Sequence, residues 1–417
     1  MYAWLLAAAI VAAPTDPSSQ SAQSTPQPGS QSAPRPTPQP APQSPEDRAK
    51  LERDIARELG ASPPSTQAPS AAPTPTPSVQ ADTTGGSPYA RLLLMPDISA
   101  IGRAGLSYVS PITGQRSPRD LPFGEPGRVR PVFEELELGL QAVVDPYARA
   151  DVFIGFGNDG VSVEEAYATW LNLPYDLQAR GGKFFAPFGR VNPQHPHTWE
   201  FADRPLALTR LLGPDGIGGA GFDVSWLAPV SWFSEVRVSY QSVAPVDPNA
   251  SGTRPAGFLR SSQFFDVGER TTVGVGASAA LTDEEPGLRN LVGGDVYVKR
   301  RLALTGAYLA FQGEALARRL AGVANGPDGW QWGMYAQAVL RPDLRHGYGV
   351  RFERAPSVFE GAGGGDFRTS GLFFYDLSEF QRLRFQAGWD RLPGGVNGFE
   401  AIAAMEFSIG AHGAHPF

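Results

Sequence analysis

The chain has 417 residues, with 48 Gly and 40 Pro, only 18% charged residues, a formal net charge of −7 and no Cys. The acidic balance argues against nucleic-acid binding, and the lack of Cys excludes disulfide scaffolds, Cys-ligated zinc and thiol nucleophiles. No run approaches the ~20 apolar residues of a transmembrane helix. A membrane β-barrel passes these tests, because its apolar positions alternate along each strand.

The first 88 residues are predicted to serve export and tethering. Residues 1–13, MYAWLLAAAIVAA, have an apolar core that suits a signal peptide and is too short to span a bilayer. Residues 14–88 are rich in Pro, Ser and Gln and have no aromatic side chain. Such a segment buries too little apolar area to offset its ordering entropy, so we expect a disordered, partly extended tether.

One helix is expected within this tether, near residues 45–59. Ser44 suits the N-cap, Pro45 the first helical position and Gly60 the position after the last turn. About 15 residues are marginal as an isolated helix. The segment therefore either forms a transient helix or contacts a periplasmic or cell-wall partner.

Residues 89–417 consist of short alternating runs bounded by Gly, Pro, Asp and Asn, the pattern of β-strands. Sixteen strands are predicted near residues 99–108, 134–144, 147–156, 163–172, 177–184, 219–227, 235–243, 258–266, 271–279, 294–300, 303–311, 331–340, 347–353, 367–377, 382–389 and 399–409. Tight turns alternate with longer connections at 110–132, 185–217, 244–257, 280–292, 312–329 and 354–366. This alternation is typical of bacterial outer-membrane barrels.

Alternation alone does not separate a membrane barrel from a soluble β-sandwich, but the aromatic residues do favour the barrel. Several lie near predicted strand ends and suit interfacial girdles, namely Trp170, Trp226, Trp232, Tyr240, Trp330, Trp332, Tyr375 and Trp389. The chain also ends in a predicted strand followed by Phe417. We therefore predict an all-β fold: a transmembrane antiparallel barrel of about 16 strands in the bacterial outer membrane, in contact with lipid and lipopolysaccharide.

Several stretches carry a family resemblance. They are VEEAY at 163–167, LQARGGKFFAPFGR at 177–190, NPQHPH at 192–197, FADRP at 201–205, SEFQRLR at 378–384 and IGAHGAHPF at 409–417. Together they resemble a porin-like family of proteobacterial outer-membrane proteins, often labelled zinc-regulated TonB-dependent outer membrane receptors. The GKFFAPFG stretch at 182–189 is also similar to phosphate-selective porins. A TonB-dependent receptor needs a globular plug and a barrel of roughly 22 strands, and this chain is too short for both.

The resemblance implies a channel narrowed by the loop at 185–217, which folds inward in porins of this size. The constriction residues are then Arg190, His195, His197, Glu200, Asp203 and Arg204. The facing wall residues are Glu135, Glu137, Arg149, Asp151, Arg180, Glu235, Arg237, Arg351, Glu353 and Arg384. This mixture of signs predicts a strong transverse field and no ion preference. The alternatives are ordinary salt bridges among these groups, or a loop that folds outward.

Metal-ligand character is confined to one short motif. His195 and His197 flank Pro196, with Glu200 and Asp203 close behind, and two imidazoles with a carboxylate suit Zn²⁺ in kind. Solvated loop histidines are the alternative interpretation. No cofactor other than zinc is indicated.

These observations favour porin-like passive diffusion of small polar or ionic solutes, and the resemblance implies a homotrimer. Two alternatives stay open: a ligand- or metal-binding uptake protein, and a structural barrel with a periplasmic partner. No G-x-S-x-G, H-E-x-x-H or P-loop motif is present. An enzyme would require Ser, His and acid side chains assembled from separate strands.

Overall fold

The structure is a computed structural model of the chain, and it describes residues 96–111, 126–158, 160–244, 252–284, 287–304, 306–319, 330–357 and 365–410. The expected signal peptide, tether and tether helix lie outside these described residues. The terminal segment that contains His412, His415 and Phe417 lies outside them as well.

Sixteen β-strands build the described part of the chain. They are β1 (Asp97–Val109), β2 (Arg130–Asp145), β3 (Ala148–Gly157), β4 (Gly160–Leu173), β5 (Leu177–Phe185), β6 (Gly218–Leu227), β7 (Phe233–Val243), β8 (Arg254–Val267), β9 (Thr271–Glu284), β10 (Gly287–Arg301), β11 (Tyr308–Arg319), β12 (Trp330–Arg341), β13 (His346–Pro356), β14 (Gly365–Ser378), β15 (Gln381–Arg391) and β16 (Asn397–Gly410).

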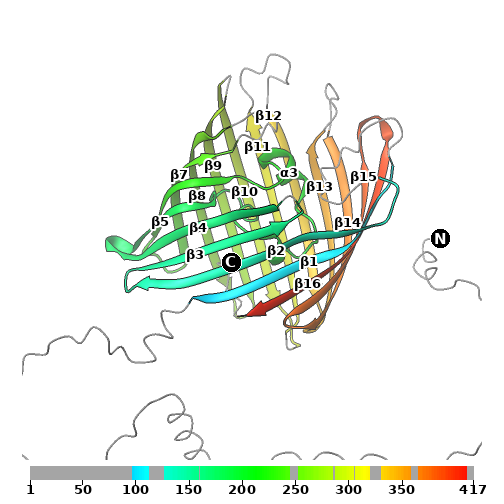
Figure 1. The fold of residues 1–417 in the computed structure, drawn as a ribbon, viewed down its shortest axis with the longest axis horizontal. Helices are drawn as coiled ribbons and strands as arrows, with labels where there is room; N and C mark the ends of the chain where they lie inside the picture. Colours follow the sequence, from blue (N-terminus) through cyan, green and yellow to red (C-terminus); the bar gives the residue numbers. More distant parts are fainter. Residues whose placement is uncertain are drawn as a thin grey trace, which may run out of the picture. The chain divides into compact units, whose positions relative to one another are not determined.

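Each strand pairs in antiparallel register with its sequence neighbours, and the sheet closes on itself because β1 also pairs with β16. The closing ladder runs from Ser99 opposite Gly410 to Val109 opposite Glu400. Figure 1 shows the resulting barrel, in which β1 to β4 cross in front of β7 to β12. The predicted all-β antiparallel barrel of about 16 strands is confirmed.

Helical structure in the described residues is confined to short segments. Besides the single-turn segments Pro174–Asp176, Pro196–Thr198 and Pro393–Gly395, it comprises the helix α3 (Leu206–Leu212). No helix among these residues is long and apolar enough to cross a membrane. Helix α3 belongs to the connection between β5 and β6, residues 186–217, which we call loop L3.

Two expected connections were placed wrongly. The loop expected at 280–292 is mostly strand, because β9 continues to Glu284 and β10 begins at Gly287. The strand expected at 303–311 instead begins at Tyr308 and continues to Arg319, into the loop expected at 312–329. The polar residues in these runs resemble loop residues when only the sequence is considered. A barrel with a wet interior carries such residues on its inner face without ending the strand.

The apolar and polar side chains lie on opposite faces of the barrel wall, as in a membrane barrel. On β6, Phe222, Val224 and Trp226 are 70%, 44% and 42% exposed, whereas Asp223 and Ser225 between them are buried. The apolar residues therefore face outward and the polar residues face the lumen. This is the reverse of a soluble fold, and it places the apolar outer face against lipid.

The aromatic residues expected at the interfaces are exposed on this outer face. Trp170, Trp226, Trp232, Tyr240, Trp330, Trp332 and Trp389 are between 41% and 66% exposed, and Tyr375 is half-buried. Trp330 begins β12, whereas Trp226 lies near the end of β6. Aromatic side chains at strand ends suit the headgroup layers on the two sides of a bilayer.

The outer face yields a stability prediction. Val350, in the middle of β13, is 49% exposed, and Val129, before β2, is 65% exposed. We expect Val350→Arg to lower the free energy of unfolding in phospholipid vesicles by about 2–4 kcal/mol, because it places a guanidinium in hydrocarbon. Val129→Arg, as a matched control outside the strands, should change it by less than about 0.5 kcal/mol. Equal effects in urea titrations of the two variants would contradict the lipid-facing assignment.

Candidate functional site

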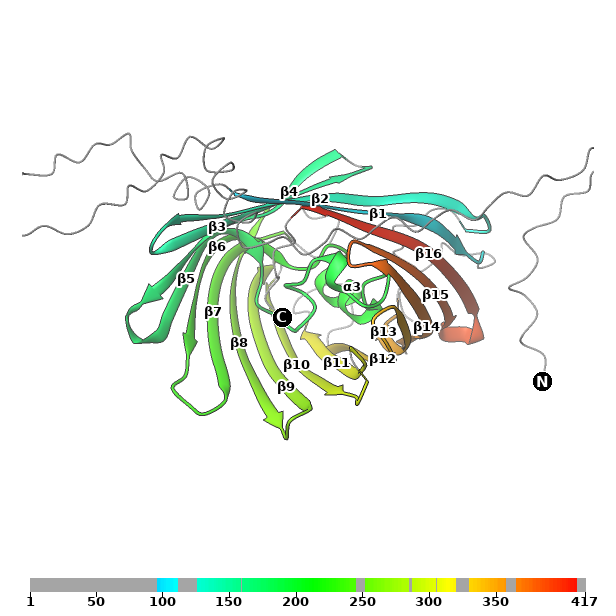
Figure 2. The ribbon, with the colours of Figure 1, turned by 90° about the horizontal axis from the view of Figure 1, so that it is seen from below.

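Loop L3 folds into the barrel, where α3 packs on the inside of the wall (Figure 2). Its apolar residues Phe188, Leu208, Leu211 and Leu212 are buried. They form one cluster with wall residues that include Phe258, Leu291, Leu316 and Tyr335. Burial of these side chains stabilises the inward position by removing apolar surface from a wet lumen.

Glu314 on β11 receives the start of loop L3. Its carboxylate accepts hydrogen bonds from the backbone N–H groups of Arg190 (3.0 Å) and Val191 (2.9 Å) and from the Tyr335 hydroxyl (2.7 Å). Gly189 makes this approach possible with a φ of 66°, and a Cβ atom there would lie 2.3 Å from Glu314 Oε2. Only glycine fits both the left-handed backbone and the close carboxylate.

Asp203 ties the middle of the loop to β13, β14 and β15. Its carboxylate contacts Arg351, lies 3.1 Å from Arg368 Nη1 and accepts a hydrogen bond from Gln386 Nε2. Burial by itself raises the pKa of Asp203, and the two guanidinium groups outweigh this effect and hold the pKa below its usual value. Glu353 Oε1 accepts the N–H of Leu206, the first residue of α3, at 2.6 Å.

A further anchor joins loop L3 to β2 and β4 through His195. The Nδ1 atom of His195 lies 2.8 Å from Glu137 Oε2 and 3.3 Å from Glu164 Oε2, and its Nε2 atom lies 2.8 Å from Glu165 Oε2. His197 Nδ1 lies 3.4 Å from the same Glu137 oxygen. Burial lowers the pKa of His195, and the three carboxylates outweigh it and raise the pKa well above its usual value.

A β-bulge explains why two consecutive residues reach this imidazole. In the β3–β4 ladder, Phe153 pairs with Glu165 whereas Ile154 pairs with Val163, which leaves Glu164 as an extra residue. A bulge interrupts the alternation of side chains, so both Glu164 and Glu165 turn into the lumen. Strict alternation would have placed Glu164 on the lipid side.

Arg204 is half-buried within the loop itself. Its Nη2 donates to Asn192 Oδ1 at 2.9 Å, and the Asn192 amide donates to the backbone oxygens of Ala186 and Ile217. Burial lowers the pKa of Arg204 to about 10 against the opposing pull of Glu314. Asn192 thus holds the two ends of the loop together, and Arg204 orients the Asn192 side chain.

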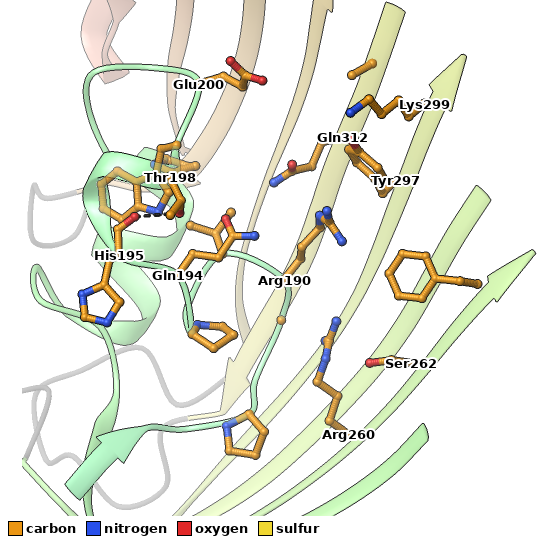
Figure 3. Close-up of a pocket in the computed structure, with 18 of the residues that line it drawn as sticks. Arg190, Gln194, His195, Thr198, Glu200, Arg260, Ser262, Tyr297, Lys299 and Gln312 are labelled. Atoms are coloured by element: carbon orange, nitrogen blue, oxygen red, sulfur yellow. Dashed lines mark hydrogen bonds between the residues drawn. The ribbon is translucent and has the colours of Figure 1, made fainter. Parts of the chain in front are cut away.

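Between loop L3 and the wall lies a cavity of about 360 Å³. Figure 3 shows Gln194, Thr198 and Glu200 of the loop on one side, with Arg260 and Lys299 of the wall on the other. Seven basic side chains line the cavity, namely Arg149, Arg180, Arg190, Arg237, Arg260, Lys299 and Arg351. Four acidic side chains line it, namely Glu165, Glu200, Asp203 and Glu235.

Most of these basic groups pair with a carboxylate on the barrel wall. Arg149 lies 3.0 Å from Asp151, Arg180 and Arg237 share Asp223, Arg237 also meets Glu235 at 2.8 Å, and Arg260 lies 2.7 Å from Asp295. The carboxylates of Asp151, Asp223 and Asp295 are themselves outside the cavity lining. The cavity surface is therefore more basic than its surroundings.

Arg190 and Lys299 differ from the other basic groups. Arg190 lies 4.0 Å above the Tyr297 ring, and Lys299 lies 4.4 Å from the centre of the Tyr308 ring. Within the described residues, neither cation has a carboxylate at ion-pair distance. Both face the cavity with their positive charge uncompensated by a contact partner.

The structure distributes the sequence-predicted site residues between the cavity surface and the layer behind it. Arg190, His195, Glu200, Asp203, Arg149, Arg180, Glu235, Arg237 and Arg351 line the cavity. His197, Arg204, Glu135, Glu137, Asp151, Glu353 and Arg384 do not, although Glu137, Asp151, Glu353 and Arg384 are buried on the inner face.

The four residues expected to bind a metal do not lie together. His195 and His197 are near each other, whereas Glu200 and Asp203 contact other residues. Glu200 Oε1 accepts a hydrogen bond from the Tyr308 hydroxyl at 3.1 Å, and Asp203 is engaged by Arg351 and Arg368. Glu137 and Glu164 of the wall take their place beside His195. Proximity in sequence was misleading here, because the nearest carboxylates come from β2 and β4.

Sequence reasoning missed Arg260, Tyr297, Lys299 and Glu314 as site residues. The first three lie in predicted strands, and Tyr297 and Lys299 share one face by alternation, so this signal was present. Glu314 lies in the connection expected at 312–329, and no sequence pattern marked it as a site residue.

Comparison with solved structures identifies the class of the fold. The chain is similar to an anion-selective porin of Comamonas acidovorans (TM-score 0.52, 10% identity, 75% of this chain and 99% of that one). It is also similar to OprB of Pseudomonas putida (TM-score 0.52, 10% identity, 77% of this chain and 95% of that one). A third similar structure is the outer membrane channel DcaP of Acinetobacter baumannii (TM-score 0.51, 12% identity, 75% of this chain and 97% of that one). With its apolar outer face, the chain is a bacterial outer-membrane β-barrel of porin fold.

No protein-family model matches the chain. A protein of Aquifex aeolicus (strain VF5), described as an uncharacterized protein, is 34% identical over an alignment of 336 residues, and the match covers 67% of this chain and 69% of that protein. The chain belongs to the same family as this Aquifex aeolicus protein.

The Asp203 anchor predicts a change in loop behaviour. We expect Asp203→Asn to destabilise the seating of loop L3 by about 1–3 kcal/mol, because Arg351 and Arg368 lose their shared carboxylate and keep Glu353, Asp390 and Glu400. The loosened loop should give larger and noisier single-channel currents in planar bilayers. Because the pKa of Asp203 is held low, the wild-type should show the same behaviour only as the pH falls through that folded-state pKa.

Asp215→Asn is the matched control, since Asp215 lies on the same loop and is exposed. It should leave the current trace unchanged. Identical traces for Asp203→Asn and the wild-type would show that the ion pairs do not hold the loop.

Proposed function

We propose that the protein is a porin-like channel for the passive diffusion of small ionic and polar solutes. The observation that carries this proposal is a cavity of about 360 Å³, lined by charged side chains, between the wall of a closed barrel and a loop that is anchored on several strands. A volume of this size accommodates small molecules. The sixteen strands also differ from the roughly 22 of a TonB-dependent receptor. The porin fold favours a channel over an enzyme.

We further propose that this channel prefers anions. Seven basic and four acidic side chains line the cavity, and most of the basic ones are paired with carboxylates behind the surface. Arg190 and Lys299 offer positive charge directly to a passing solute. The sequence predicted a mixture of signs and no ion preference. A lining in which one sign of charge dominates favours ions of the opposite sign, and here the basic side chains dominate.

The preference is tested by reversal potential across planar bilayers under a KCl gradient. The wild-type should give discrete conductance steps, and its reversal potential should have the sign expected for Cl⁻ selectivity. Arg190→Glu combined with Lys299→Glu should shift the reversal potential toward K⁺ selectivity, because both uncompensated cations become anions. Arg190→Gln combined with Lys299→Gln should give an intermediate value.

Arg270→Glu is the control, since Arg270 is exposed in the turn between β8 and β9, away from the cavity lining. It should leave the reversal potential close to that of the wild-type. A barrel that inserts but never conducts would rule out the channel. A conducting barrel with K⁺ selectivity would retain the channel and remove only the anion preference.

We also propose that the barrel forms a homotrimer, as the resemblance implies. Gln141, Arg149, Tyr167 and Arg180 line the cavity, so the next residue along each strand faces outward. These outward residues, Ala142, Ala150, Ala168 and Gly181, are direct neighbours across β2 to β5. A row of small side chains supports close approach between copies.

The trimer is measured by light scattering of the protein in mild detergent. Ala168→Trp should reduce the mass to that of one chain, because the indole separates the paired faces. Leu259→Trp, at a 49% exposed position on β8, should keep the trimer. A monomeric wild-type would exclude this assembly.

A further inference from the structure

The cluster around His195 has the geometry of a metal site. Its donor atoms are Glu137 Oε2, Glu164 Oε2 and His195 Nδ1, which all lie within 4.8 Å of one another. His197 Nδ1 lies 3.4 Å from the Glu137 oxygen but outside this set of three donors, so it would become the fourth ligand by moving toward the ion. The shortest separations around His195 Nδ1 are 2.8 and 3.3 Å. Donor atoms in a tetrahedral Zn²⁺ site with bonds of about 2.0–2.1 Å are ~3.3 Å apart.

Glu165 sets the orientation of the His195 ring. Its Oε2 lies 2.8 Å from His195 Nε2, and with a hydrogen on that nitrogen the ring donates a hydrogen bond to this carboxylate. The lone pair of Nδ1 then points at two carboxylate oxygens, which would repel it. A positive charge, either a proton or a metal ion, has to lie between them. A carboxylate that orients an imidazole in this way is a regular partner of metal-bound histidine.

Charge balance favours a divalent ion in this place. Three carboxylates surround His195, and no Lys or Arg in the described part of the chain lies at ion-pair distance from Glu137, Glu164 or Glu165. A single proton on His195 leaves two negative charges in a buried cluster, whereas a divalent ion with neutral imidazoles leaves one. Buried charge without a partner is costly, so the ion with the larger charge stabilises the cluster more.

We propose that Glu137, Glu164, His195 and His197 bind one divalent transition-metal ion, and that this ion fastens loop L3 to β2 and β4. Two imidazole nitrogens and two carboxylate oxygens suit Zn²⁺ best among the common ions. His195 and Glu137 are 2% and 3% exposed, so the ion has a structural role and is not a transported solute. This proposal is independent of whether the barrel conducts.

The test is Zn²⁺ binding to the full chain in detergent after dialysis against EDTA, measured by calorimetry. The protein should carry His346→Asn, His412→Asn and His415→Asn, so that only His195 and His197 remain as histidine ligands. We expect one Zn²⁺ per chain and a higher melting temperature in the loaded protein. Co²⁺ in the same site should show the strong visible absorption of four-coordinate cobalt.

Glu164→Gln and His197→Gln each remove one ligand and keep side-chain size, and each should weaken Zn²⁺ affinity at least tenfold. Glu200→Gln is the matched control, because Glu200 belongs to the sequence-predicted set and binds Tyr308 instead. It should leave the affinity unchanged. Binding that survives Glu164→Gln and His197→Gln, or no stoichiometric binding at all, would overturn the proposal and leave a proton in the site.

Discussion

The structure depends on the need of every backbone N–H and C=O group to find a partner where no water is present. In hydrocarbon an unpaired backbone group costs several kcal/mol, and a sheet avoids this cost only by closing. The β1–β16 ladder provides the closure, and it leaves no free edge in the barrel. Once the sheet is closed, alternate side chains must face either lipid or lumen, and this division organises everything else in the protein.

Many charged side chains of the described residues gather in the lumen, and the chain uses them to seat loop L3. Asp203, Glu314 and His195 each bind the loop to a different part of the wall. An apolar cluster around α3 supports these polar anchors. A loop held in this way is a fixed constriction, so its residues define a lasting surface for passing solutes.

Pairing determines the electrostatic character of that surface more than composition does. The chain as a whole is acidic, with a net charge of −7. In the lumen, however, several carboxylates lie behind the arginines that face the cavity. The exposed layer is therefore basic, and Arg190 and Lys299 contribute charge that no carboxylate among the described residues meets at ion-pair distance. The carboxylates around His195 are the exception, because imidazoles are their only cationic partners among the described residues.

The sequence by itself determined the architecture. Period-two alternation, turn residues and aromatic strand ends defined a sixteen-strand membrane barrel, because these local patterns follow directly from the two-sided environment of each strand. It also placed Arg190 and His195 in an inward loop, through resemblance to porins. Strand ends near residues 280–319 were missed, since lumen-facing polar residues look like loop residues in a linear sequence.

Only the tertiary structure decided which charges meet. The partners of His195 come from β2 and β4, and those of Asp203 from β13 to β15. Glu164 reaches the lumen only through a bulge that breaks the alternation. Such contacts depend on the register of strands far apart in the chain and on the path of loop L3. A one-dimensional pattern carries no record of either, because pairing across the lumen is set by three-dimensional distance and not by spacing along the chain.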